Sequence, residues 1–181
     1  VQLADTAEEQ GTMATADLDG DGTMAVYYGR HTSTGGEGLR RAYYNGTTEV
    51  VASKDTATNA VAGVADITGD GVKEVVFVGS STDLRYYNES AGTVVTFYSS
   101  GIGTNGGYGV GSPRDFDGDG VAEVPMVDGS NNGVLVHANG STTPVVSGGV
   151  DKSPVAGVEL DAADGIEFVF AAGGDLQYAT L

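Results

Sequence analysis

The sequence contains no cysteine and no long apolar run, and each absence excludes a class of protein. Without cysteine, the chain can form no disulfide and perform no thiol chemistry. No apolar stretch approaches the roughly 18 residues that a membrane-spanning helix requires, and no signal peptide is visible. The abrupt start at Val1 is consistent with the removal of a leader or of neighbouring segments. The 181 residues suffice for one domain with a core.

Positive charge is also scarce. The chain has 8 basic and 25 acidic residues, for a net charge of −17. This charge disfavours nucleic acid and anionic membrane surfaces as partners. Two explanations of the acidic excess remain open. The acids could be loaded with metal ions, or the protein could come from a high-salt habitat, where salt screens self-repulsion. The low lysine content resembles that of proteins from halophilic archaea.

Helical periodicity is absent as well, because no segment shows a convincing helical pattern over 11 residues. Instead, short runs rich in Val, Tyr and Phe alternate with turns of Gly, Asn, Asp and Ser, which predicts β-strands. The 30 glycines lie between these runs, which indicates many turns rather than disorder. We therefore expect an all-β fold.

A repeated acidic motif organises the chain. The stretch RDFDGDGVAEVPMV (residues 114–127) has three alternating aspartates, and related stretches begin at residues 16, 65 and 158. The first acids of the four copies are Asp17, Asp66, Asp115 and Glu159, at spacings of 49, 49 and 44 residues. A period in the 40s is typical of a repeat array or a β-propeller.

Each of the first three repeats contains four strand-like runs, which predicts four antiparallel four-stranded blades at about residues 11–54, 60–100, 108–148 and 153–181. The last repeat ends after its third run. Residues 1–6 are the candidate for the missing strand. Their pairing with the last sheet would close a ring and remove an exposed edge, so we predict a single four-bladed β-propeller.

The motif D-x-D-G-D-G-x-x-[DE], followed by an apolar strand, resembles the FG-GAP or VCBS-like repeats, which include the calcium-bearing blades of integrin α-chain propellers. The resemblance covers nearly the whole chain in four copies. It implies a propeller with calcium loops, although propellers of that family commonly have seven blades. It also implies an extracellular adhesion or ligand-binding module. Some members are attached to polysaccharide lyases or other enzymes.

This family pattern places side-chain ligands at loop positions 1, 3, 5 and 9 and a carbonyl ligand at position 7. Oxygen ligands favour Ca²⁺ over zinc or copper, and Mg²⁺ rarely receives a full protein cage. We expect about three Ca²⁺ sites, with weaker binding in the first copy because Ala25 occupies position 9. The expected ligands are Asp17, Asp19, Asp21 and the Thr23 carbonyl; Asp66, Thr68, Asp70, the Val72 carbonyl and Glu74; and Asp115, Asp117, Asp119, the Val121 carbonyl and Glu123.

The fourth copy is irregular, with Glu159, Asp161, Asp164 and Glu167 at a shifted spacing, so its metal binding is doubtful. For every copy the alternative is a solvated Asp/Gly turn, which the shared register of three copies disfavours. A structural ion that fixes the turn between two strands is favoured over a ligand-bridging or catalytic ion.

Three glycosylation sequons begin at Asn45, Asn88 and Asn139. Each is expected in the turn between the third and fourth strands of its repeat. Two interpretations remain open, because Asn-Gly is also a favourable hairpin turn. The sequons are either turn chemistry or sites of surface glycosylation.

The longer loops are expected on the face opposite the acidic loops, and loops on a rigid scaffold commonly carry binding residues. The ligand-face candidates are therefore Arg30, His31, Tyr108 and Asn131. Neither His31 nor His137 lies in a sequence metal motif.

We expect a non-enzymatic interaction or adhesion module at the cell surface or outside the cell, with a glycan or a surface protein as its partner. Two alternatives remain. The chain could be the propeller domain of a polysaccharide-degrading enzyme, which would need charged residues converging in one cleft. It could also be a purely structural domain of a longer surface protein.

Overall fold

The computed structural model describes residues 12–32, 35–53, 56–79, 83–102, 109–151, 153–160 and 165–181. Over these ranges the chain forms β-strands and turns and no helix. The described residues consequently include no helix that could cross a membrane. The expected all-β class is confirmed.

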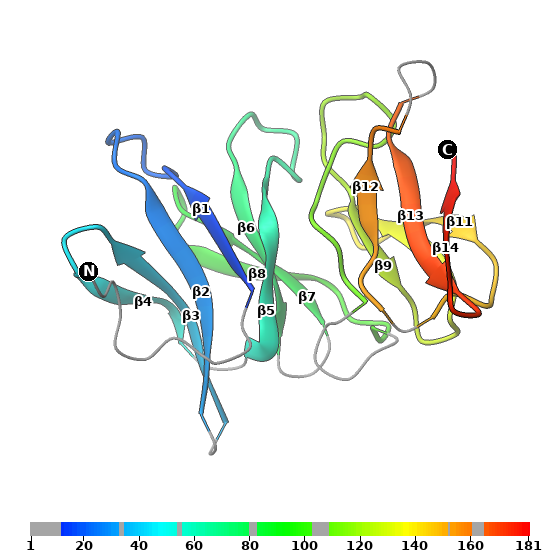
Figure 1. Cartoon of the computed structure of the whole chain (residues 1–181). Helices are drawn as coiled ribbons and strands as arrows, with labels where there is room; N and C mark the ends of the chain where they lie inside the picture. The colour runs from blue at the N-terminus through cyan, green and yellow to red at the C-terminus, as the bar shows by residue number, and fades with distance from the viewer. Residues whose placement is uncertain are drawn as a thin grey trace.

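The strands form four antiparallel sheets, each a meander in which the strands pair in chain order (Figure 1). Each acidic motif lies between the first and second strands of its repeat. The first sheet contains β1 (Met13–Ala16), β2 (Ala25–Thr32), β3 (Gly35–Tyr43) and β4 (Thr48–Ser53); the second contains β5 (Thr56–Ala65), β6 (Glu74–Gly79), β7 (Leu84–Asn88) and β8 (Thr93–Tyr98); the third contains β9 (Val124–Val127), β10 (Gly133–Val136) and β11 (Thr142–Val146); the fourth contains β12 (Ala156–Val158), β13 (Glu167–Ala172) and β14 (Asp175–Ala179).

The third sheet differs from the predicted four regular strands. Its first strand is replaced by residues 109–114, which meet their neighbour only at isolated bridges, Val110 to Met126 and Arg114 to Glu123. Between the bridges, the Gly111 amide donates to the Pro125 carbonyl at 2.8 Å. Pro113 has no amide hydrogen for a regular ladder, which accounts for the irregular pairing. Residues 1–6, the expected closing strand of the fourth sheet, lie outside the described residues.

The strands that follow the second and third acidic loops are among the most deeply buried of the described strands. All residues of β6 and β9 are buried, whereas the outer strands β8 and β11 are largely exposed. A strand buried on both faces reads as a continuous apolar run, as in EVVFV. The sheets therefore present their second strands to neighbouring sheets and their fourth strands to solvent.

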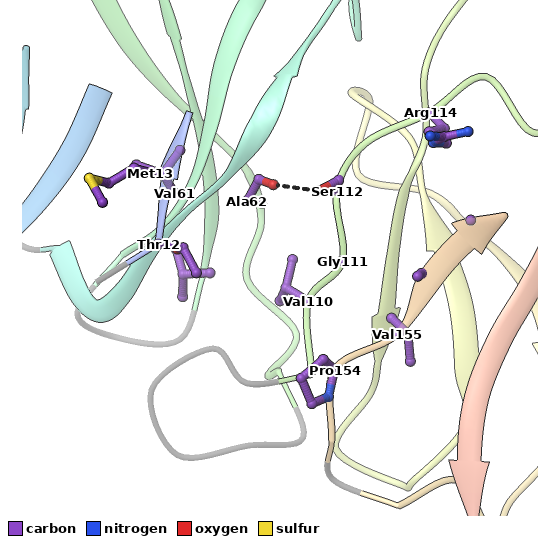
Figure 2. A pocket seen from close by; sticks show the side chains of 13 residues that line it. Thr12, Met13, Val61, Ala62, Val110, Gly111, Ser112, Arg114, Pro154 and Val155 are labelled. Atoms are coloured by element: carbon purple, nitrogen blue, oxygen red, sulfur yellow. Dashed lines mark hydrogen bonds between the residues drawn. The ribbon is translucent and has the colours of Figure 1, made fainter. Parts of the chain in front are cut away.

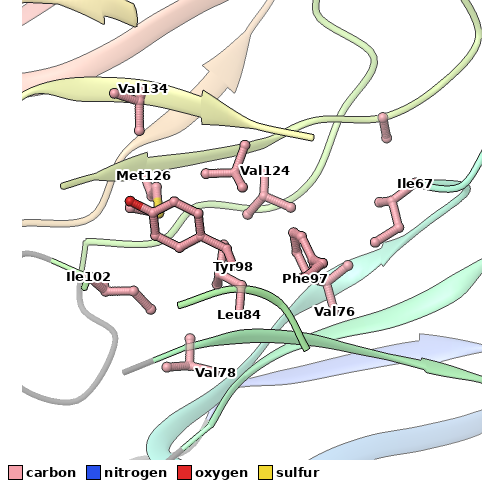
Figure 3. Packing of buried hydrophobic residues seen from close by; sticks show 12 residues of the cluster. Ile67, Val76, Val78, Leu84, Phe97, Tyr98, Ile102, Val124, Met126 and Val134 are labelled. Carbon is pink, nitrogen blue, oxygen red and sulfur yellow. The ribbon is translucent and has the colours of Figure 1, made fainter. Parts of the chain in front are cut away.

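Three apolar clusters lie between consecutive sheets rather than within one sheet. Figure 3 shows the second of them, where side chains of the second and third sheets meet. The sheets thus pack face to face, and each interface is shared by two repeats. Representative members are Tyr27, Leu39, Val75 and Phe77 between the first and second sheets; Val76, Phe97, Val124 and Met126 between the second and third; and Val127, Leu135, Phe168 and Phe170 between the third and fourth.

Arg41 of β3 adds a polar link between the first two sheets. Its Nε contacts the carboxylate of Glu49 on β4, and its Nη1 donates to Glu89 Oε1 at 2.9 Å, just after β7. The Arg41 side chain is only 15% exposed. A shielded, charge-assisted pair of this kind is stronger than a pair on the open surface.

The first strands of all four repeats border one cavity of about 530 Å³ (Figure 2). Most of its lining comes from β1, β5, the irregular segment before the third acidic loop, and β12 with the residues before it, and Val78 of β6 adds to it. On its wall the Ser112 hydroxyl donates to the Ala62 carbonyl at 3.0 Å, which joins the second and third repeats. The lining residues are Thr12, Met13, Val61, Ala62, Val78, Val110, Gly111, Ser112, Arg114, Pro154, Val155, Ala156 and Gly157.

Glycine permits close contact of the backbones around this cavity. A Cβ atom at Gly111 would lie 2.2 Å from the Val155 carbonyl oxygen of the fourth repeat. At Gly63 a Cβ would lie 2.7 Å from the ring of Pro113. Any larger residue at Gly111 must push the third and fourth repeats apart.

We predict that Gly111→Ala destabilises the protein by roughly 1–3 kcal/mol, because overpacking against a backbone oxygen cannot be relieved by a side-chain rotation. Thermal unfolding in Ca²⁺ measures this change. The control is Gly129→Ala in the β9–β10 turn, where the nearest atom to a new Cβ is 4.0 Å away. The control should change the stability by no more than about 1 kcal/mol. Equal melting temperatures for the two variants would contradict the close contact.

Candidate metal centre

The first aspartate of each of the first three acidic loops holds the loop closed. Its two carboxylate oxygens accept hydrogen bonds from the amides of the glycines three and five residues later. Those glycines have φ values between 72° and 92°, a region that favours glycine. The bonds are Gly20 and Gly22 to Asp17, both 2.9 Å; Gly69 and Gly71 to Asp66, both 2.7 Å; and Gly118 and Gly120 to Asp115, 2.7 and 2.9 Å.

The position-5 aspartate stabilises the second half of each loop in the same way. Its Oδ1 accepts the amide of the residue two positions later, which is the residue expected to offer its carbonyl to the metal. These bonds join Thr23 to Asp21 at 2.7 Å, Val72 to Asp70 at 2.8 Å and Val121 to Asp119 at 2.8 Å. Three loops therefore share one hydrogen-bond pattern.

A buried glutamate at position 9 ties each of the last three loops to the sheet. Its Oε2 accepts the amide of the residue at position 2, across the mouth of the loop. Glu74, Glu123 and Glu167 accept from Ile67, Phe116 and Leu160 at 3.2, 3.0 and 2.8 Å. The three glutamates are 0%, 2% and 2% exposed. The fourth copy therefore keeps this contact, although Asp161 and Asp164 lie outside the described residues and Glu159 is exposed.

Two loops bring three acids close enough to share a cation. One carboxylate oxygen from each of Asp115, Asp117 and Glu123 lies within 4.8 Å of the others, and the same is true of Asp17, Asp19 and Asp21. The second loop does not bring three of its acids within that distance, as far as the described residues show. There Thr68 Oγ1 donates to Glu74 Oε1 at 3.3 Å.

In the third loop, several carboxylates repel one another around a buried glutamate, which favours a bound cation. Burial, together with the charges of Asp117, Asp119 and Asp115, raises the pKa of Glu123 to about 7, against the opposing hydrogen bond from Phe116. Burial and the charges of Asp70 and Asp66 likewise raise the pKa of Glu74. A hard cation with oxygen ligands relieves such repulsion, so these residues fit calcium.

Near two of the position-9 glutamates, the neighbouring strand or the residue after it contributes a side chain that the sequence motif does not reveal. Asn88, the last residue of β7, donates from its side-chain amide to Glu74 Oε1 at 3.3 Å. In the third repeat, His137 Nδ1 lies 3.7 Å from Glu123 Oε1. Only the strand register brings these residues to the loops, and a search for local metal motifs does not include it.

The three sequons do not occupy one equivalent position, contrary to the expectation. Asn45 and Asn139 lie in matching turns, where each accepts the amide two residues later at 2.9 Å. Asn88 is instead the last residue of β7 and contacts the second acidic loop. Glycosylation of the three residues stays a prediction.

The ligand-face candidates are only partly described. Arg30 and His31 belong to β2, but nothing is described of their side chains, and Tyr108 lies outside the described residues. Asn131 lies in the β9–β10 turn with a φ of 62°. Asp128 holds this turn by accepting the amides of Ser130 and Asn132 at 2.8 and 2.9 Å. The structure does not bring these four candidates together in a described site.

The chain resembles known proteins both in sequence and in fold. Residues 66–126, which contain the second and third acidic loops, match the FG-GAP-like repeat family. Among solved structures, the chain is similar to the V. cholerae biofilm matrix protein Bap1, with 23% sequence identity and a TM-score of 0.52. The similarity covers 88% of this chain and 23% of Bap1, so the chain spans less than a quarter of that protein. At this identity the likeness concerns the fold alone. A search of curated proteins found no significant match.

We predict that Glu123→Gln has opposite effects on stability with and without calcium. In EDTA at pH 8, Glu123 is ionised in both the folded and unfolded states, and its raised pKa opposes folding; the substitution should stabilise the fold by roughly 1–3 kcal/mol. In Ca²⁺ the substitution removes a ligand and should destabilise it. Chemical denaturation in each buffer measures both values.

The pH dependence of the unfolding free energy in EDTA supplies the control for this experiment. The pKa of Glu123 is higher in the folded than in the unfolded state, so in EDTA the wild type should gain stability as the pH falls from about 8 towards 5. The contribution of Glu123 to this gain should be absent from Glu123→Gln. Parallel pH profiles for the two proteins would refute the assignment.

Proposed function

We propose that this chain is a calcium-stabilised extracellular adhesion module. The observation that carries the proposal is the buried carboxylate of Glu123, which closes a loop containing three further acids. Its neighbours Asp115 and Asp117 bring their oxygens within 4.8 Å of it. Calcium, when bound, supplies two positive charges and accepts six to eight oxygen ligands.

The chain's own residues support calcium at the first three loops. Asp115, Asp117, Asp119 and Glu123 supply carboxylates in the third loop, and the Val121 carbonyl completes the set. The second loop has the same sequence pattern of ligands, with the Thr68 hydroxyl in place of one carboxylate. The first loop has the same internal hydrogen bonds but Ala25 at position 9. The fourth copy retains Glu167 and is the weakest candidate.

We also infer that the four sheets close into a four-bladed propeller through residues 1–6. Two features support this closure. The first strands of all four repeats border one cavity. In addition, β14 is an outer strand in a three-stranded sheet, and its Leu176 and Tyr178 are 80% and 62% exposed. An edge strand of this kind is normally paired or protected, and residues 1–6 precede β1 in the chain, whose first residue Met13 also lines the cavity.

Adhesion is the activity that the comparisons support best. The FG-GAP-like match and the shared fold with a biofilm matrix protein point to a non-enzymatic structural or adhesion domain. The likeness covers 23% of Bap1, so it concerns one module of that protein. A glycan or a surface protein is its proposed partner, and the cell surface or the extracellular space is its proposed location.

We predict that Ca²⁺ raises the melting temperature well above its value in EDTA, since each site filled at 100 times its Kd adds roughly 2.7 kcal/mol. Differential scanning calorimetry at low ionic strength measures the shift. Mg²⁺ should give a smaller shift because it prefers to retain water. The variant Asp115→Asn/Asp117→Asn should lose part of the gain.

A salt series separates the two explanations of the acidic surface. If metal loading explains it, millimolar Ca²⁺ should stabilise the protein far more than NaCl at equal ionic strength. If high-salt adaptation alone explains it, only molar salt should raise the melting temperature, through screening. In that case the calcium proposal fails.

A further inference from the structure

The cavity of about 530 Å³ between the first strands of the four repeats contains none of the expected metal ligands. Its volume lies in the range of ligand pockets, about 300–1,000 Å³. Backbone contacts fix its walls: Gly111 lies against the Val155 carbonyl without room for a Cβ atom, and the Ser112 hydroxyl donates to the Ala62 carbonyl at 3.0 Å (Figure 2). The described walls are therefore formed before any ligand arrives.

Arg114 is the only charged residue in the described lining of this cavity. It lies at the end nearest the third acidic loop, away from Thr12 and Pro154 (Figure 2). Two hydrogen bonds with Glu123 fix its backbone: the Arg114 amide donates to the Glu123 carbonyl at 3.0 Å, and the Arg114 carbonyl accepts the Glu123 amide at 2.7 Å. A fixed backbone therefore carries the guanidinium at the rim of the cavity.

This guanidinium has no carboxylate partner within the described ranges. Arg41 and Arg85 are both paired, with Nη1 and Nε donating at 2.9 Å to Glu89 and Asp83 respectively. In the described part of the chain, no hydrogen bond or ion pair engages the Arg114 side chain. A guanidinium binds a carboxylate through two parallel hydrogen bonds. Arg114 is therefore available to a carboxylate that enters from outside.

The strands around the cavity can pair with an extended chain. The strands β1, β5 and β12 each lie at the edge of their sheet, and each contributes residues to the lining. The outer edge of such a strand carries N–H and C=O groups that its own sheet does not pair. An extended peptide binds to groups of this kind through its own backbone, and the side chains then determine specificity.

The remaining lining favours an aliphatic ligand with a single charge. Val61 and Val155 are buried walls, 2% and 4% exposed. Besides Arg114, only Thr12 and Ser112 offer polar side chains in the described lining, so the hydroxyl groups of a sugar would find few partners. The net charge of −17 repels a polyanion. One carboxylate on an aliphatic peptide fits both conditions.

We propose that this cavity binds the C-terminal end of a partner polypeptide, with the terminal carboxylate on Arg114 and an aliphatic last side chain against the apolar walls. The inference adds the chemistry of a protein partner to the proposed adhesion function, and it involves no metal ion. The site differs from the loop face of Arg30 and His31 that the sequence favoured, because neither residue is part of the described lining.

The test uses the whole chain in Ca²⁺ at low ionic strength, because salt weakens a partly exposed ion pair. The probes are the peptide acetyl-Gly-Gly-Val-Leu with a free carboxylate, the same peptide with an amidated end, and the methyl glycoside of glucuronic acid. Saturation-transfer NMR and calorimetric titration measure binding. We expect the free peptide to bind, and the amidated peptide and the glucuronide to bind at least about tenfold more weakly.

Variants locate the site. Arg114→Gln should weaken binding of the free peptide at least about tenfold and should bind the free and amidated peptides equally well. The control Lys73→Gln removes the same charge from an exposed residue outside the cavity lining, and it should bind as the wild type does. Ala156→Leu should weaken binding by filling part of the cavity. If Ala156→Leu fails to fold, the Arg114 and Lys73 variants still decide the question.

Several results would overturn the inference: the free peptide does not bind, the amidated peptide or the glucuronide binds equally well, or Arg114→Gln binds as the wild type does. An equal loss in Lys73→Gln would show non-specific attraction, and normal binding by Ala156→Leu would place the peptide elsewhere. In each case, a calcium-induced rise in melting temperature would leave the calcium-stabilised module intact. Absence of that rise would instead refute the proposed function, so the two failures are distinguishable.

Discussion

The contact on which the last three repeats depend is the hydrogen bond between a buried glutamate and the backbone across its acidic loop. Glu74, Glu123 and Glu167 each begin or directly precede a strand that is packed against a neighbouring sheet. Each carboxylate reaches back to the amide at position 2 of its loop. The glutamate side chain therefore links the loop, the buried strand and the interface between sheets. A change in its charge alters the stability of all three.

Much of this architecture follows from local sequence patterns. The acidic loops lie between first and second strands as the repeat predicts, because aspartate and glycine at fixed spacing select one turn geometry. The all-β class follows from the short β-branched runs. The irregular first strand of the third repeat is harder to anticipate, since its ladder is broken by Pro113 and by contacts with two other repeats.

The parts of the candidate site that the sequence does not reveal all involve register between strands. Asn88 and His137 reach the acidic loops from the neighbouring strand, and one residue of slip would turn each to the other face of its sheet. The same register separates Asn88 from the turn asparagines Asn45 and Asn139. The sequon pattern alone suggests that the three asparagines occupy equivalent positions. It does not show where the third strand of each repeat ends, and that end differs between Asn88 and the two turn asparagines.

Glycines on or beside the first strands set the spacing between successive repeats. Contacts at Gly63, Gly111 and Gly157 leave no space for even a methyl group between successive repeats. The first strands consequently approach one another closely. Larger residues at these positions would push successive repeats apart and widen the cavity that the first strands border. Residue size on these strands thus sets the width of the space that the repeats share.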